Sequence, residues 1–236
     1  MLSNNEKRKY IKQIMLSEIG VSGQEKIKEA KVAIVGCGGL GCPTLLYLCA
    51  AGVGTIGIID FDTVHITNLH RQILFGQKDV NLKKVDVAKT KLNLMHPEIN
   101  IIAHDVLIND ENAAELLKDY DLIIDGCDNF ETRYTVNDAC VKLNKPLVYG
   151  SILGFEGQLS VFNYRGSKDL RAIFPVPPAK EDVPDCSENG VLATVPGVMG
   201  TLLANEALKL ILNLNPLMNQ YIILDLKKMN LNCLHF

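Results

Sequence analysis

The sequence contains no tryptophan, no C-x-x-C pair and few aromatic residues, which make up 6% of the chain. Its seven cysteines have scattered spacing, which argues against both a disulfide framework and a zinc site. Lysines and arginines are not gathered into a basic stripe, and the formal net charge is −3. We therefore expect reduced thiols, no zinc and no nucleic-acid partner.

Apolar stretches without a charged residue are short in this sequence. The longest uncharged apolar stretch, residues 190–204, is shorter than the roughly 20 residues that a span needs, and it contains Pro196. Residues 1–12 are polar and charged and lack the apolar segment of a secretory signal. We expect a cytoplasmic protein without a membrane partner.

The composition allows one ordinary globular core. The 236 residues are 47% apolar and 22% charged, and no repeat or low-complexity tract divides them. A single domain over 1–236 is the default. The sequence pattern changes near residues 30 and 150, which divides this domain into three parts.

Strand-like and helix-like patterns alternate in the first two thirds of the chain. Runs rich in valine and isoleucine predict strands over 31–35, 55–59, 99–104, 121–124 and 146–149. Apolar residues three or four positions apart predict a helix over 82–95. The alternation indicates a mostly parallel sheet with helices on both faces.

The two ends of the chain carry different signals. Ser3 with Glu6, and Ser22 with Glu25, fit the capping box and predict two short helices. Residues 158–164 are typical of a strand, and 165–190 have little periodicity. The apolar run 191–212 predicts a helix buried on every side, which suggests a subunit interface.

A glycine-rich loop follows the first predicted strand. Gly36, Gly38, Gly39 and Gly41 stand where a strand ends and a helix begins, so the backbone can approach a phosphate closely. Asp60 follows the second strand, where an acid can hold ribose hydroxyls. These residues alone favour a dinucleotide such as NAD.

The next segment contains groups that handle phosphates. Arg71 offers a planar fork and Lys84 a mobile charge, a pair better suited to a triphosphate than to the two phosphates of a dinucleotide. Asp128 adds a carboxylate suitable for Mg²⁺ at the same edge of the sheet. Taken singly, Arg71 and Lys84 could equally be surface charges, and Asp128 a helix cap.

Several motifs together resemble a known family. They are Gly36-Cys-Gly-Gly-Leu-Gly41, Asp60-Phe-Asp62, Asn68-Leu-His-Arg71-Gln72, Lys84 and Asp128-Asn129, with Tyr10-Ile-Lys-Gln13-Ile, Gly157-Gln158, Asp185-Cys186, Gly190-Val191 and Gly197-Val-Met-Gly200. In this order they resemble the ThiF/MoeB/HesA family, relatives of ubiquitin-activating enzymes, over nearly the whole chain. The resemblance implies a Rossmann-like α/β fold with a helical N-terminal arm and antiparallel C-terminal strands, in a homodimer.

The resemblance also implies a reaction. Such enzymes adenylylate the C-terminal glycine carboxylate of a small ubiquitin-like carrier ending in Gly-Gly, similar to ThiS or MoaD, and release pyrophosphate. The product would serve sulfur transfer in thiamine or molybdopterin biosynthesis, with a cysteine desulfurase or another sulfur donor as a further partner. The cofactors implied are ATP and Mg²⁺. The single domain 1–236 would then consist of a helical arm over 1–30, a nucleotide-binding core over 31–150 and a carrier-binding and dimer region over 151–236.

Site roles follow from the same resemblance. The residues implied in ATP binding are Gly36, Gly38, Gly39, Gly41, Asp60, Asp62, Asn68, Arg71, Gln72, Lys84, Asp128 and Asn129. Among them, Gly39 and Asp60 would bind adenosine and ribose. Asn68, Arg71 and Lys84 would grip the triphosphate, and Asp128 would hold Mg²⁺.

Two residues are further candidates for chemistry. Cys186 lies in the irregular loop at the place where ThiF-like members use a cysteine, although Asp185 and Glu188 nearby should raise its pKa. Lys12 stands where relatives carry an arginine that reaches the phosphates of the other subunit, and lysine keeps the charge without the fork. Relatives also hold a zinc with two C-x-x-C pairs, which are missing here, since Cys233 and His235 cannot close a four-ligand site.

Other functions fit parts of the pattern. An NAD-dependent dehydrogenase would share the glycine loop and Asp60 but would need a proton donor, which none of the five histidines obviously supplies. A non-catalytic scaffold would not need Arg71, Lys84 or Asp128. Adenylyltransferases that act on peptides or tRNA-linked groups use the same core and stay open as alternatives.

Overall fold

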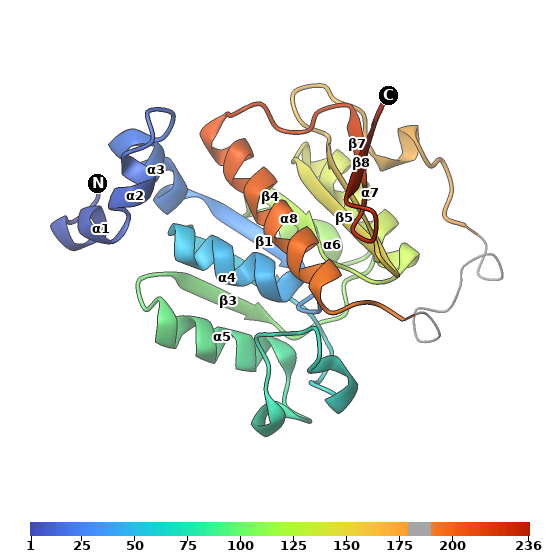
Figure 1. Ribbon diagram of the computed structural model, residues 1–236, viewed down its shortest axis with the longest axis horizontal. Coiled ribbons are helices and arrows are strands. Elements are labelled where there is room, and N and C mark those ends of the chain that lie inside the picture. Colours follow the sequence, from blue (N-terminus) through green and yellow to red (C-terminus); the bar gives the residue numbers. More distant parts are fainter. Residues whose placement is uncertain (179–189) are drawn as a thin grey trace.

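A single mixed sheet forms the centre of the molecule (Figure 1). The computed structural model describes residues 1–178 and 190–236. Its eight strands lie in the order β3-β2-β1-β4-β5-β6-β7-β8. They are β1 (Lys31–Val35), β2 (Thr55–Ile59), β3 (Asn100–His104), β4 (Leu122–Asp125), β5 (Leu147–Leu153), β6 (Glu156–Phe162), β7 (Gln220–Asp225) and β8 (Asn230–His235). The neighbouring strands β3, β2, β1, β4 and β5 are parallel, and β6, β7 and β8 each pair antiparallel with the strand before them. The predicted fold class is therefore confirmed.

Helices cover both faces of the sheet (Figure 1). They are α4 (Gly41–Ala51), α5 (Lys84–Met95), α6 (Ala113–Leu117), α7 (Phe130–Leu143) and α8 (Thr194–Leu212), with the 3₁₀ turns η1 (Ile66–Asn68), η2 (Gln77–Asp79) and η3 (Leu170–Ala172). Helices α4, α5 and α8 pack on one face, and α6 and α7 on the other, each over its own buried apolar cluster. The parallel strands are therefore buried on both sides, which explains their continuous valine and isoleucine runs.

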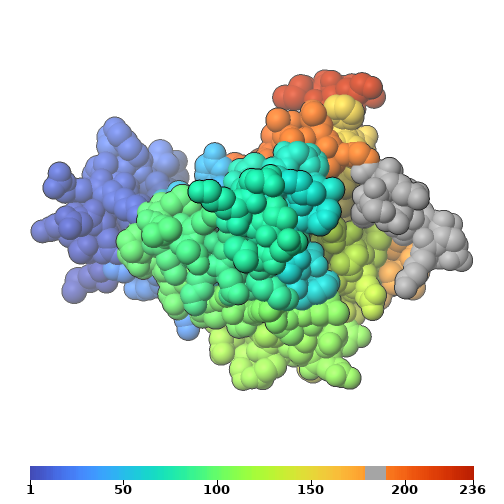
Figure 2. Space-filling view, turned by 90° about the horizontal axis from the view of Figure 1, so that it is seen from below, coloured from blue at the N-terminus to red at the C-terminus, as the bar shows by residue number. Residues whose placement is uncertain are grey.

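The N-terminal arm consists of three short helices and projects from one side of the body (Figure 2). They are α1 (Asn4–Lys9), α2 (Ile11–Ile14) and α3 (Gly20–Glu29). The capping box of Ser3 is present. The one predicted at Ser22 is wrong, because α3 already begins at Gly20, without a side-chain cap. The amides of Gln13 and Gln24 both donate to the carbonyl of Ala51 and attach the arm to the end of α4.

The predicted boundaries match best in the first half of the chain. Strands β1 and β2 agree at both ends, and β3 and β4 differ by one residue. Strand β5 runs beyond the predicted 146–149 because its second half pairs with β6 in a hairpin. Helices α5 and α8 begin two and three residues later than predicted, and α6 and η3 were not predicted.

Helix α8 is long and apolar enough to cross a membrane by length and composition, and 56% of that window is buried inside the fold. It contacts α4 and strands β5 and β6. The prediction that it is buried on every side is wrong, since Val198 is 38% exposed and Asn205 faces outward. One side of α8 therefore remains available on the surface of this chain.

Candidate functional site

A cleft lies beyond the carboxyl ends of β1, β2 and β4. Its lining is Val35, Gly36, Gly38, Gly39, Leu40, Ile59, Asp60, Phe61, Asp62, Arg71, Gln72, Lys84, Val106, Leu107, Ile108, Gly126, Cys127, Asp128, Asn129, Thr132 and Ile152. Ligands of parallel α/β sheets bind at this edge, where strand order reverses. The structure thus brings together ten of the twelve residues implied in ATP binding.

The glycine loop turns the chain sharply from β1 into α4. Gly36 has a φ of +95°, and a Cβ there would lie 2.7 Å from the carbonyl oxygen of Gly126. A Cβ on Gly41 would lie 2.1 Å from the carbonyl oxygen of Gly36. Only glycine fits either position. The bare loop directs the N-terminus of α4 at the cleft, where it favours an anion.

Asp60 organises the loop from the next strand. Its carboxylate accepts hydrogen bonds from the backbone N–H of Cys37 at 2.7 Å and of Asp62 at 2.8 Å. Burial raises the pKa of Asp60, while Lys84 and these two hydrogen bonds oppose the rise. A carboxylate has lone pairs beyond these two bonds, so it can also accept from ribose hydroxyls.

Lys84 is the first residue of α5 and is 5% exposed. Its ammonium donates to Asp62 at 2.8 Å. Burial alone would lower the pKa of Lys84, but attraction by Asp60 and the hydrogen bond to Asp62 raise it above the ordinary value. The cleft therefore contains a permanently charged ammonium among two carboxylates.

Arg71 and Gln72 approach the glycine loop from η1. One guanidinium nitrogen of Arg71 donates to the carbonyl of Thr67 at 3.0 Å, and its Cδ lies beside Gly39. Gln72 is 4% exposed, and its Oε1 is the buried side-chain oxygen without a hydrogen-bond partner in the described part of the chain. A buried unpaired amide costs about 1–3 kcal/mol, so a bound ligand that supplies a donor there would be favoured.

The loop after β4 supplies an acid and a helix cap. The cap of α7 is Asn129, whose side chain accepts from the backbone N–H of Thr132 at 2.9 Å. Asp128 lines the cleft beside it. One carboxylate fits Mg²⁺, which is usually held by one or two carboxylates together with substrate phosphates and water. Among residues 1–178 and 190–236 no cluster of three or more potential ligands forms a complete metal cage.

An apolar wall of the cleft was not predicted from the sequence. It is formed by Phe61 after β2 and by Val106, Leu107 and Ile108 after β3. Phe61 and Leu107 are 50% and 51% exposed, so their apolar surface is open to a ligand in the cleft. The signal available in the sequence was the apolar triplet 106–108 just beyond a predicted strand.

Some predicted site residues lie elsewhere. Asn68 is outside the cleft lining, and its Oδ1 accepts from the N–H of His65 at 3.1 Å. Gly41 serves the packing of the loop. Lys12 is exposed on α2, which attaches to the far end of α4, and eleven residues of α4 separate it from the cleft by roughly 16 Å. Cys186 lies outside the described residues, so its role stays a prediction.

The cysteines of the glycine loop and of the loop after β4 are buried and are not presented as thiolates. Cys37 and Cys127 are buried. The hydrogen bond with Cys42 and burial raise the pKa of Cys37, and burial raises that of Cys127. Both thiols therefore stay protonated at neutral pH and pack as small apolar groups.

A buried ion pair beneath the cleft was also missed. Arg133 on α7 is 5% exposed, and its guanidinium lies 3.2 Å from the carboxylate of Asp125, which is fully buried. Arginine four residues into a predicted helix gave no signal by itself. Its partner became visible only when the parallel sheet placed the end of β4 beneath α7.

Known proteins are similar to this chain in sequence. The ThiF family model matches residues 10–235. The adenylyltransferase and sulfurtransferase MOCS3 of Anopheles gambiae is 50% identical over 212 residues, which cover 90% of this chain and 48% of the relative. The sulfur carrier protein adenylyltransferase of Thermus thermophilus is 44% identical over 229 residues, or 94% of this chain and 84% of the relative. The chain spans about half the length of the MOCS3 relatives it matches.

Solved structures agree with the fold. E. coli MccB with AMPCPP and MccA superposes with a TM-score of 0.84 at 25% identity, covering 98% of this chain and 72% of that one. MccB with ATP gives a TM-score of 0.79 at 26% identity, covering 90% and 65%. The resemblance seen in the motifs is confirmed at the level of the family: the chain belongs to the ThiF family.

Proposed function

We propose that this chain adenylylates the C-terminal glycine carboxylate of a small ubiquitin-like sulfur-carrier protein, consuming ATP and releasing pyrophosphate. The observation that carries the proposal is one cleft in which the glycine loop, Arg71 and Lys84 converge. Relatives at 44–50% identity are named as adenylyltransferases, one of them of a sulfur carrier. The pathway served would be thiamine or molybdopterin biosynthesis.

The two ends of the cleft suit the two ends of ATP. The apolar wall of Phe61, Val106, Leu107 and Ile108 can pack against the adenine ring, and Asp60 stands beside it for the ribose. The phosphates would then lie along the glycine loop toward Arg71 and Lys84. In this arrangement adenine lies at the apolar end of the cleft and the phosphates lie at its charged end.

The chemistry needs charge neutralisation more than proton transfer. A terminal carboxylate has a pKa of about 3.5 and is ionised at neutral pH. One of its oxygens forms a bond to the α-phosphorus, the bond from that phosphorus to the bridging oxygen breaks, and pyrophosphate leaves with the electron pair. Arg71 and Lys84 stabilise the negative charge that meets there. Mg²⁺ held by Asp128 would supply further positive charge when bound.

The alternatives fit the cleft less well. Hydride transfer to NAD would need a proton donor, and among the described lining residues there is no histidine. MccB, whose structures are titled with MccA, is only 25–26% identical to this chain, against 44–50% for the relatives named for MOCS3 and the sulfur carrier. A protein carrier is therefore the better-supported substrate.

Residues at matching positions of β5 to β8 connect the cleft with the edge of the sheet. The register places Ile152, Gly157, Leu224 and Leu231 side by side on one face, where Met199 of α8 fills the space over Gly157. Ile152 lines the cleft, and Leu231 is 58% exposed on the edge strand. We propose that the carrier docks at the exposed outer end of this row, around Leu231, with its tail in the cleft at Ile152.

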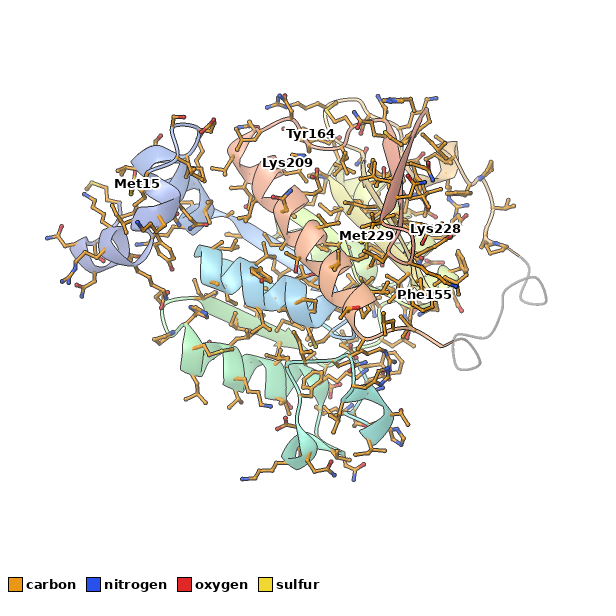
Figure 3. All side chains as sticks on the ribbon, viewed as in Figure 1. Met15, Phe155, Tyr164, Lys209, Lys228 and Met229 are labelled. Atoms are coloured by element: carbon orange, nitrogen blue, oxygen red, sulfur yellow. The ribbon has the colours of Figure 1, made fainter. Side chains whose placement is uncertain are left out.

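The hairpin tips extend the same surface. Phe155 is 44% exposed and Met229 78% exposed, and Figure 3 shows them near Lys228 on one side of the molecule. The ammonium of Lys227 lies 5.7 Å from the centre of the Phe155 ring. Two lysines around exposed apolar groups fit a carrier with an apolar patch rimmed by acids.

We expect Leu231→Asp to raise the carrier concentration needed for half-maximal activity about 10-fold, the scale of a moderate interface contact. A buried aspartate would lose hydration in the complex. ATP affinity should not change, because the side chain is three strands from the cleft-lining Ile152. The matched control is Leu94→Asp on α5, where Leu94 is 80% exposed. Equal carrier KM values for both variants would exclude this docking row.

A second copy of this chain would add a positive charge to the cleft. Lys12 cannot reach its own cleft past α4, whereas the groove formed by Gln13, Tyr47, Thr201 and Leu208 beside the arm offers a surface for a partner. We propose a homodimer in which Lys12 of one subunit faces the phosphates of the other. Sedimentation of the full chain as a monomer at micromolar concentration would rule this out.

The test of the function is ATP–pyrophosphate exchange with purified protein, Mg²⁺ and carriers ending in Gly-Gly. We expect exchange only when carrier is present, because the carboxylate is the attacking group. The matched control is the same carrier with its last glycine removed, which should support none. Tight NAD binding together with no exchange for any carrier would show that the glycine loop holds a dinucleotide instead.

A further inference from the structure

We propose that Arg133 is a positioning residue for adenylylation, which fixes the turn carrying Asp128 at the edge of the cleft. The proposal rests on the proposed function of that cleft. Arg133 itself does not line the cleft, and its guanidinium is enclosed between α7, β5 and the loop after β4. Its effect on the reaction must therefore pass through the backbone that it holds.

Both backbone polar groups of Cys127 are bound by this ion pair. The N–H of Cys127 donates to Oδ1 of Asp125 at 2.9 Å, and its carbonyl accepts from Nη2 of Arg133 at 2.6 Å. Nη1 of Arg133 closes the triangle with Oδ2 of Asp125 at 3.2 Å. The two peptide planes that meet at Cys127 are therefore both held, and the one bound by Arg133 leads directly into Asp128.

The same guanidinium ties this turn to the neighbouring strand. Nη1 also donates to the carbonyl of Gly150 on β5 at 2.7 Å, two residues before the cleft-lining Ile152. The guanidinium lies 5.0 Å from the ring centre of Tyr149. Arg133 thus connects the Asp128 turn with β5, the strand that carries the cleft-lining Ile152.

The glycine loop depends on the same turn. The N–H of Gly126 donates to the carbonyl of Val35 at 2.8 Å, and the carbonyl of Gly126 lies where a side chain on Gly36 would be. Hydrogen bonds and close packing therefore connect the glycine loop, which would face the phosphates, with the turn that carries Asp128, which would face the metal. A shift at Cys127 would change both.

Lysine cannot replace this fork. The planar guanidinium donates to three acceptors that lie in different directions, whereas the single nitrogen of a lysine ammonium reaches fewer of them at once. Burial alone would lower the pKa of Arg133, but attraction by Asp125 raises it above the ordinary arginine value, so the group stays charged. Arg133→Lys therefore retains the charge and removes mainly the geometry.

The first measurement is hydrogen exchange of the peptide containing 126–129, which does not depend on activity. We expect Arg133→Lys to speed exchange of the Cys127 amide at least about 10-fold, because its hydrogen-bond frame loosens. The control is Arg165→Lys, since Arg165 also lies 5.0 Å from a tyrosine ring but contacts Asn213 at the other end of the sheet. Unchanged exchange at 126–129 would overturn the proposal.

The second measurement is a double-mutant cycle with Asp128→Asn in the carrier-dependent exchange assay. Alone, Arg133→Lys should lower kcat about 10–100-fold, as for groups that orient a ligand's binding side chain, with KM for ATP less affected. In the Asp128→Asn background the same change should cost less than about 3-fold, because the two residues act through one contact. Full additivity would show a merely structural role.

Calorimetric measurement of ATP binding with and without Mg²⁺ distinguishes a failure of the proposed function from a failure of the positioning role of Arg133. If the wild-type protein binds no ATP, the proposed function fails, whatever Arg133 does to the turn. If ATP binds more tightly with Mg²⁺, Arg133→Lys should reduce that gain as Asp128→Asn does. A gain that stays at the wild-type value in Arg133→Lys would overturn the positioning role while leaving the function intact.

Discussion

Arg71→Ala should reduce carrier-dependent ATP–pyrophosphate exchange at least about 100-fold, the cost of removing one donor that stabilises developing charge. The guanidinium is held beside Gly39 by its hydrogen bond to the carbonyl of Thr67, so it enters the cleft ready to bind a phosphate. Because Arg71 is only half-buried and forms no ion pair among the described residues, the fold should survive the change.

Two further variants make this result specific. Arg71→Lys retains the charge but not the fork, and we expect it to recover only part of the exchange. Lys78→Ala removes a positive charge from the neighbouring exposed turn η2, outside the cleft lining, and should be without effect. If Arg71→Ala exchanges as fast as the Lys78 control, phosphate is bound elsewhere and the assignment of the cleft is wrong.

The fold could be predicted well from the sequence where a local residue pattern corresponds to one buried strand of the sheet. Strands 31–35 and 55–59 agree at both ends because each is a buried valine and isoleucine run between turn residues. The helix start predicted at Ser22 is wrong, since an S-x-x-E pattern inside a helix resembles one at its start. The tertiary contacts of the arm with Ala51, not the local cap, set where α3 lies.

The site could be predicted only as far as its residues follow strand ends. Asp60 and Asp128 were found because parallel strands bring their carboxyl ends to one edge. Arg133 and the wall of Phe61 and Leu107 were missed, since their meaning depends on neighbours distant in sequence. Arg133 becomes interpretable only with Asp125 and the carbonyl groups of two loops around it.

Lys84→Met should abolish measurable exchange and also weaken the fold. Lys84 is 5% exposed and its ammonium is attracted by both Asp60 and Asp62, so methionine leaves these two carboxylates without their cation. Loss of one partner of a buried pair costs about 3–5 kcal/mol, and we expect about 2 kcal/mol here because half of Asp62 is exposed to solvent. Urea unfolding at pH 7.5 measures this loss.

The pH dependence of that loss distinguishes charge from packing. Burial already raises the pKa of Asp60, and removing Lys84 removes the attraction that opposes the rise. An acid whose pKa is higher in the folded state loses stability as pH rises from the unfolded value through the folded one. The penalty of Lys84→Met relative to wild type should therefore be smaller at pH 4.5 than at pH 7.5. Lys84→Arg, which retains the charge, should show little of this difference, and an equal penalty for Lys84→Met at both pH values would assign the loss to packing of the lysine stem alone.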